Sequence, residues 1–208
     1  FPLPPEELAW GFQALPQAGA GHDVIVAAVR KDALAEFADI FTACGLQTRF
    51  TLAALARSAL ASGFSGDGAL LDLAPGHSEL LAVEHSMPVS LRVLPYGLNK
   101  LGENPAALDS LAAAVGGLRA GQKLLLSGEG AGISPDLAAQ LGARLGPGVA
   151  CEWLAPPAGG EQSATLAGLQ RAVEQTGGRL ALELQVEATD RRAEAIQPAP
   201  RKWALLAA

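Results

Sequence analysis

The sequence has little charge, few aromatic residues and almost no sulfur. Of its 208 residues, 17% are charged, 5% are aromatic, two are Cys and one is Met. The 21 acidic residues outnumber the 15 Lys and Arg residues, giving a net charge of −6. This balance argues against a nucleic-acid-binding protein, which needs a basic surface. Two Cys residues cannot form a disulfide framework, and no quartet of Cys and His has the spacing of a zinc site.

Long hydrophobic runs are also missing. No apolar stretch reaches the roughly 18 residues that a membrane-spanning helix needs. No basic segment followed by a short apolar run begins the sequence, so we expect no signal peptide. Half of the residues are nevertheless hydrophobic, mainly Ala and Leu, and the chain is long enough to bury a core. The composition indicates a soluble, cytosolic-type globular protein.

Alternating strand and helix patterns predict an α/β fold. Apolar runs predict strands at 24–29, 47–52, 69–73, 123–126, 149–153 and 180–186, and the first reads as fully buried. Two further runs predict a hairpin of strands 80–84 and 89–94. Helical spacing predicts helices at 31–44, 53–62, 105–118, 134–145 and 163–175. This order predicts a mixed or parallel sheet covered by helices, with an antiparallel central block.

The loop at 72–79 has the composition of a phosphate-binding turn. Asp72 lies at the end of a predicted strand, a sharp turn through Gly76 follows, and Ser78 and Glu79 come next. Carboxylates, a hydroxyl and backbone N–H groups in this arrangement can hold a metal-bound phosphate. The two carboxylates can also serve as an acid/base pair, although carboxylates beside a turn more often cap or solvate it.

A second loop, at 126–131, is rich in glycine. Gly128 and Gly130 follow a predicted strand directly, where the absence of a side chain lets a ligand approach the backbone. Short Gly-rich turns between strands and helices are common, so either loop taken alone is better explained as purely structural.

Together and in this order, the two loops resemble those of the actin-like ATPase superfamily. The resemblance is to the branch of the type IV pilus assembly protein PilM and the type II secretion protein GspL. There the second phosphate loop reads roughly Asp-apolar-Gly-x-x-x-Thr-Asp, as 72–79 does in part, and the adenosine loop reads roughly apolar-Thr-Gly-Gly-Gly-Ala, as 126–131 does. The hairpin ending at Gly97 and the strand–helix unit ending at Gly45 also match. The resemblance implies an actin-like (RNase H-like) α/β fold of mixed sheets with flanking helices, partial or degenerate.

Departures from the motifs bear on the chemistry. Ala74 replaces the first glycine of the phosphate turn, Pro75 lacks an N–H donor, and Glu129 places a carboxylate where an anionic ligand would lie. The first phosphate loop of the family is expected upstream of Phe1. The resemblance therefore implies no catalytic residue, no metal site and no cofactor, with ATP and Mg as the alternative. It leaves a relic nucleotide site at Asp72, Gly76, Ser78, Gly128 and Gly130.

The function implied is a non-catalytic scaffold of a type IV pilus assembly or type II secretion inner-membrane platform. Such a scaffold works through protein–protein contacts with other platform proteins and a motor ATPase, in the bacterial cytoplasm at the inner-membrane face, without nucleic acid. The alternative is an ATP-binding actin-like ATPase or a small-molecule kinase fragment. A third possibility is a generic α/β interaction module.

The C-terminal residues differ in composition from the rest. We expect residues 1–187 to form the actin-like cytoplasmic domain and 188–208 to be a basic linker leading into a truncated transmembrane helix. Basic residues, Trp203 and an apolar run in this order are typical of the cytoplasmic flank of a membrane span. An ordinary basic tail is the alternative.

The remaining candidate residues have simpler explanations. His22, His77 and His85 have no partner spacing of a metal site and are expected in exposed loops. Cys44, beside the helix-ending Gly45, is expected to be a buried core thiol.

Overall fold

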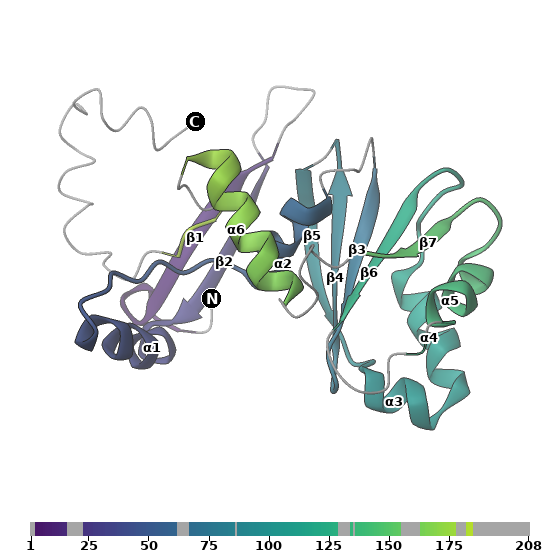
Figure 1. The fold of residues 1–208 in the computed structure, drawn as a ribbon, viewed down its shortest axis with the longest axis horizontal. Helices are drawn as coiled ribbons and strands as arrows, with labels where there is room; N and C mark the ends of the chain where they lie inside the picture. Colours follow the sequence, from purple (N-terminus) through teal and green to yellow (C-terminus); the bar gives the residue numbers. More distant parts are fainter. Residues whose placement is uncertain are drawn as a thin grey trace. The chain divides into compact units, whose positions relative to one another are not determined.

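The computed structural model describes residues 3–15, 23–61, 67–85, 87–128, 134, 136–154, 163–177 and 182–184. The chain forms two compact units (Figure 1). The first comprises residues 1–13, 26–51 and 182–208, and the second comprises residues 14–25 and 52–181.

A five-stranded mixed sheet forms the centre of the second unit, in the order β5-β4-β3-β6-β7. β3 (Gly68–Leu73) pairs antiparallel with β4 (Ser78–Glu84), which pairs antiparallel with β5 (Met87–Leu94). On its other side, β3 pairs parallel with β6 (Lys123–Gly128), and β6 pairs parallel with β7 (Ala150–Trp153). The predicted mixed sheet and its antiparallel central hairpin are confirmed.

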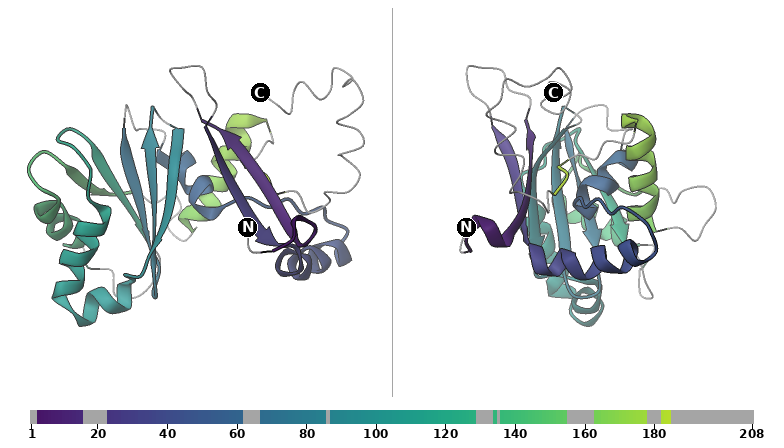
Figure 2. Two further views of the ribbon diagram at one scale, coloured as in Figure 1. Left: turned by 180° about the vertical axis from the view of Figure 1, so that it is seen from behind. Right: turned by 90° about the vertical axis from the view of Figure 1, so that its left-hand side faces the viewer.

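Helices cover both faces of this sheet (Figures 1 and 2). α3 (Leu98–Glu103), α4 (Pro105–Val115) and α5 (Leu137–Leu145) lie on one face. α2 (Ala53–Ser58) lies on the other face and packs on α6 (Ala164–Thr176). A short 3-10 turn, η2 (Ala59–Ala61), extends α2, so the predicted helix 53–62 divides in two. α3 was not predicted, because its six residues are too few to show helical periodicity.

The main core lies between the sheet and the helices α4 and α5. Leu71 on β3, Leu126 on β6, Leu111 on α4 and Leu141 on α5 are all fully buried. Burial of each such side chain contributes about 1.5–3 kcal/mol to folding. Because successive residues of a strand point to opposite faces, the intervening Asp72 belongs to the face covered by α2 and α6.

Local capping sets the starts of two helices. Asn104 caps α4 by accepting a 3.0 Å hydrogen bond from Ala106 N. Ser163 caps α6 by accepting a bond from Thr165 N. α5 begins later than predicted, at Leu137.

Two strands, β1 (Leu8–Ala14) and β2 (Val24–Arg30), form a two-stranded sheet, and α1 (Lys31–Ala43) follows. All of this lies in the first unit except residue 14 of β1 and residues 24 and 25 of β2. A 3-10 turn, η1 (Pro5–Glu7), precedes β1. The sequence did not predict the strand β1. The predicted end of α1 is confirmed, since Gly45 adopts a left-handed φ of +73° there.

Three predictions for this part of the chain are wrong. β2 is not a buried strand, because Val24 and Val26 are 48% and 45% exposed. Cys44 is exposed and is not a core thiol. Residues 47–52 form no strand, and among the described residues they make a single bridge, between Phe50 and Leu184. A two-stranded sheet and one helix offer too little surface to bury these groups.

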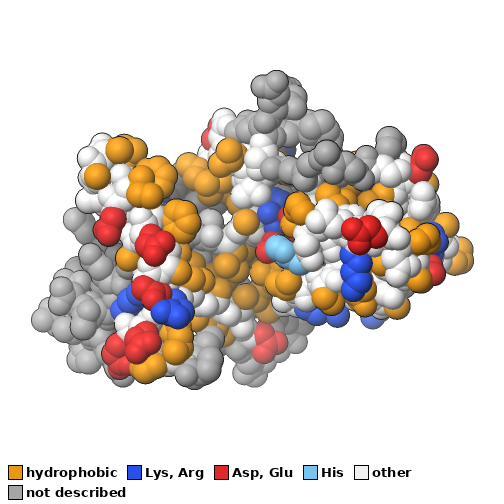
Figure 3. Space-filling model, turned by 90° about the horizontal axis from the view of Figure 1, so that it is seen from below, with side chains coloured by type: hydrophobic (Ala, Val, Ile, Leu, Met, Phe, Trp, Pro, Cys, Tyr) orange, Lys and Arg blue, Asp and Glu red, His pale blue; other side chains and the backbone are white. Residues whose placement is uncertain are grey.

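α1 shows the same shortage of packing surface. None of its residues is buried, and Phe37, Ile40 and Phe41 are 45–62% exposed. Hydrophobic side chains lie among charged ones on this surface (Figure 3).

Residues 182–184 are the described part of the predicted strand 180–186. Leu184 makes the bridge to Phe50, and Leu182 has a left-handed φ of 50°. The C-terminal segment 188–208 lies outside the described residues. In the described part of the chain, no helix is both long and apolar enough to cross a membrane.

Candidate functional site

A row of polar side chains crosses three neighbouring strands of the second unit. Asp72 on β3 is paired in register with Glu79 on β4 and with Ser127 on β6. Residues directly opposite each other in a sheet share a face, so all three belong to the face covered by α2 and α6. Ser127 Oγ donates a 2.6 Å hydrogen bond to Asp72 Oδ1. The structure thus brings together both carboxylates of the first predicted loop.

Arg57 reaches this row from α2. Its Nη2 forms an ion pair with Glu79 Oε2 and lies 3.4 Å from Asp72 Oδ2. Its Nη1 donates a 2.9 Å hydrogen bond to Thr165 Oγ1, in the first turn of α6. We call Arg57, Asp72, Glu79, Ser127 and Thr165 the Arg57 cluster. The guanidinium group joins α2 and α6 to β3 and β4, and the hydrogen bond from Ser127 to Asp72 adds β6.

The burial of Arg57 makes these contacts necessary. Arg57 is only 5% exposed, and a buried charge is tolerated only when it is paired and hydrogen-bonded. Its Nε is buried with no hydrogen-bond partner among the described residues. One guanidinium therefore faces two carboxylates in a partly dry environment, where charge interactions are stronger than in water.

Sequence reasoning missed Arg57. A usable signal was present, because Arg57 is the one charged residue in the otherwise apolar and small segment 53–61. A lone charge in a helix that is apolar all round must find a partner inside the fold.

The backbone of the turn between β3 and β4 is engaged within the protein. Ala74 N donates to His77 O at 3.0 Å, which closes the turn. The first amides of α3, Leu98 N and Asn99 N, donate to the carbonyl oxygens of Ala74 and Pro75 at 3.0 Å. Amides at a helix start bind phosphate in many nucleotide sites, but these two are already satisfied.

Two glycines of this region have different surroundings. A Cβ added at Gly97 would lie closer than 3.0 Å to three backbone atoms, Pro75 O, Gly76 C and His77 N. Glycine is therefore required at position 97 by close packing against the turn. A Cβ added at Gly76 would meet no described atom within 4 Å, so the backbone at Gly76 is open to an approaching group.

The other predicted site residues are placed as follows. Ser78 is fully buried, and its hydroxyl donates to the carbonyl oxygen of Tyr96. Gly128 ends β6, opposite Leu73. Gly130 lies outside the described residues, as does Glu129.

These groups do not fit a magnesium-bound nucleotide as the fold family would place it. Arg57 already holds the two carboxylates that would face the metal ion. The Ser78 hydroxyl is engaged by Tyr96, and the amides that begin α3 are engaged by the turn. Among the described residues of the two loops, the open backbone at Gly76 favours ligand approach.

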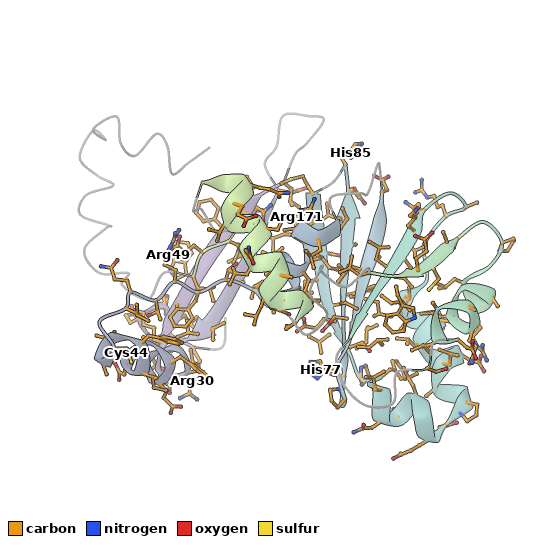
Figure 4. All side chains as sticks on the ribbon, viewed as in Figure 1. Arg30, Cys44, Arg49, His77, His85 and Arg171 are labelled. Atoms are coloured by element: carbon orange, nitrogen blue, oxygen red, sulfur yellow. The ribbon has the colours of Figure 1, made fainter. Side chains whose placement is uncertain are left out.

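Outside the Arg57 cluster, the titratable side chains of the described residues do not gather into a site. His77 and His85 are exposed and lie at opposite ends of β4, as Figure 4 shows, whereas His22 lies outside the described residues. No group of three or more His, Cys, Asp or Glu side chains with metal-binding geometry occurs among the described residues. Burial, with a smaller contribution from the nearby carboxylate of Glu152, raises the pKa of the Cys151 thiol to about 11.

No protein-family model matches the sequence, and no curated protein matches it significantly. Among solved structures, a chain of the PilM-PilN type IV pilus biogenesis complex is similar at 20% identity and a TM-score of 0.51, covering 74% of this chain. The ethanolamine utilization protein EutJ from Carboxydothermus hydrogenoformans is similar at 12% identity over 54% of this chain and 51% of its own, with a TM-score of 0.38. The Aquifex aeolicus Ppx/GppA phosphatase is similar at 9% identity over 56% and 64%, with a TM-score of 0.29.

The likeness to this chain of the PilM-PilN complex confirms the predicted actin-like α/β fold. The present chain spans 57% of that chain's length.

Proposed function

We propose that this chain is an actin-like component of a type IV pilus assembly platform, or of the related type II secretion platform, and that it works by protein–protein contacts. In this role it lies in the cytoplasm at the inner-membrane face of a bacterium and connects a motor ATPase to membrane proteins of the platform. It needs no nucleotide for this role.

The structural likeness to a chain of the PilM-PilN complex carries the pilus part of the proposal. That chain belongs to a PilM-PilN complex of type IV pilus biogenesis, and we extend a partnership of this kind to the present chain. The acidic net charge of −6 is consistent with protein partners rather than nucleic acid.

The Arg57 cluster supports the non-catalytic part of the proposal. An actin-like ATPase needs a carboxylate at its metal ion and backbone donors at its phosphates. Here Asp72 faces Arg57, and the turn after β3 is bonded to the start of α3. Both arrangements oppose phosphate chemistry at this loop.

The partner is tested by isothermal titration of the 208-residue chain with the cytoplasmic segment of a PilN-type protein from the same organism. We expect saturable binding at one-to-one stoichiometry, unchanged by ATP and magnesium. Absence of binding to this segment and to a GspL-associated secretion motor would overturn the assignment to either platform.

Catalysis is tested separately with radiolabelled ATP and magnesium. We expect equal, background release of phosphate from the native chain and from Asp72→Asn. Turnover by the native chain that Asp72→Asn abolishes would instead establish the alternative, an ATP-binding actin-like ATPase or kinase fragment. The open backbone at Gly76 is the observation that favours this alternative.

A further inference from the structure

We infer that Arg57 is a built-in cation that takes the place of a divalent metal ion at the carboxylate pair of Asp72 and Glu79. The inference deepens the proposed function, since it rests on the non-catalytic role and explains how the site remains stable without a ligand. The guanidinium supplies the positive charge that an actin-like enzyme obtains from its nucleotide-bound metal.

The chemistry of the Arg57 cluster supports this substitution. Around the guanidinium lie the carboxylates of Asp72 and Glu79 and, at 2.9 Å from Nη1, the hydroxyl of Thr165. Ser127 adds a second hydroxyl, bonded to Asp72. Carboxylate and hydroxyl oxygens are the ligands that hard divalent cations prefer. The donor set around Arg57 is therefore suited to a cation, and a protein cation is present.

Beside the Arg57 cluster, α2 and α6 pack tightly against each other. Gly168 of α6 lies against α2, where an added Cβ would lie 2.7 Å from Ala56 C and 3.0 Å from Arg57 Cα. The two helices thus approach backbone to backbone next to the guanidinium. The contacts of Arg57 hold α2 and α6 on the sheet without any ligand. A bound nucleotide would hold them there only while it is bound.

The test is metal rescue of Arg57→Gln, a variant that removes the charge and keeps a polar side chain. Two carboxylates left without their cation repel each other, so the melting temperature falls. We expect added MgCl2 to raise it again by about 5 °C or more once magnesium reaches about 100 times its dissociation constant. The native chain should shift by less than about 1 °C under the same conditions, because Arg57 already occupies the position.

Two matched variants serve as controls. Arg57→Gln combined with Asp72→Asn should lose the magnesium rescue, since one of the two carboxylates is gone. Arg49→Gln, which breaks the exposed pair between Arg49 and Glu183, should show no rescue at all. If Arg57→Gln is insoluble in buffer with EDTA, it is purified in buffer with MgCl2. We expect the variant to be folded there, because magnesium replaces the missing positive charge.

Three results would overturn the inference: equal magnesium stabilisation of the native chain, no rescue of a folded Arg57→Gln, or a variant that fails to fold in both media. None of these readouts involves a partner protein. Failure of the internal-cation inference is therefore distinguishable from failure of the platform assignment, which depends on the titration with a PilN-type segment.

Discussion

Replacement of Gly97 by Ala tests whether the turn after β3 is packed as described. The backbone at Gly97 has φ −105° and ψ 174°, which any residue can adopt, so the substitution causes no conformational strain. The cost arises from the added Cβ, which would lie closer than 3.0 Å to three backbone atoms of residues 75–77. Backbone atoms cannot rotate away as a side chain can. We therefore expect a loss at the upper end of the overpacking range of about 1–3 kcal/mol.

The matched control is Gly102→Ala, five residues along the chain in α3. A Cβ at Gly102 meets nothing within 4 Å, and alanine favours a helix by about 0.5–1 kcal/mol over glycine. The same substitution should thus have opposite signs at the two positions. Urea unfolding followed by circular dichroism measures both free energies. Equal or greater stability of Gly97→Ala compared with the native chain would refute the close packing of the turn.

Four further predictions concern individual side chains of the two units. Gly168→Ala should lower the free energy of unfolding by about 1–3 kcal/mol in urea titrations, whereas Leu166→Ala, at a position 56% exposed on the same helix, should change it little. Leu126→Ala should cost about 2–5 kcal/mol in the same assay, because Leu126 is fully buried in the core. The native state keeps the Cys151 thiol protonated up to a pKa of about 11, against 9.0 ordinarily, so stability should fall as pH rises from 9.0 to about 11, and Cys151→Ala should remove that part of the loss. At pH 8, a thiol reagent should modify the exposed Cys44 before Cys151, and faster modification of Cys151 would contradict the described burial.

Much of the second unit could be predicted from the sequence because its signals are local. β3 and β6 are short apolar runs that end in turn residues, and the β4–β5 hairpin has a tight connection. The start of α6 at Ala164 follows from the preference of the preceding residue, Ser163, for the N-cap position.

Strands without a strong partner were predicted poorly. Residues 47–52 contain Thr, Phe and Thr, which favour β structure, yet only Phe50 finds a bridge. β1 forms despite a proline-rich lead because β2 lies alongside it. Strand formation depends on pairing and burial more than on the residues themselves, so sequence preference alone misplaces such segments.

The candidate site was predicted only in part for a similar reason. Asp72 and Glu79 were identified because a loop motif places them near each other in sequence. Arg57 and Thr165 lie 108 positions apart in the sequence, on different helices, and only the packing of α2 on α6 brings them together. A motif read along the chain shows the acidic half of the Arg57 cluster and misses the cation that neutralises it.

The discontinuous path of the first unit has a consequence for biosynthesis. The hydrogen bond between Arg49 and Glu183 joins positions 134 residues apart, and the bridge between Phe50 and Leu184 is equally distant. At a translation rate of about 5–20 residues per second, the ribosome needs roughly 7–27 s to synthesise the intervening chain. During that interval Arg49 and Phe50 lack Glu183 and Leu184, their partners in the finished fold. The first unit is therefore expected to be completed only after Leu184 has been synthesised.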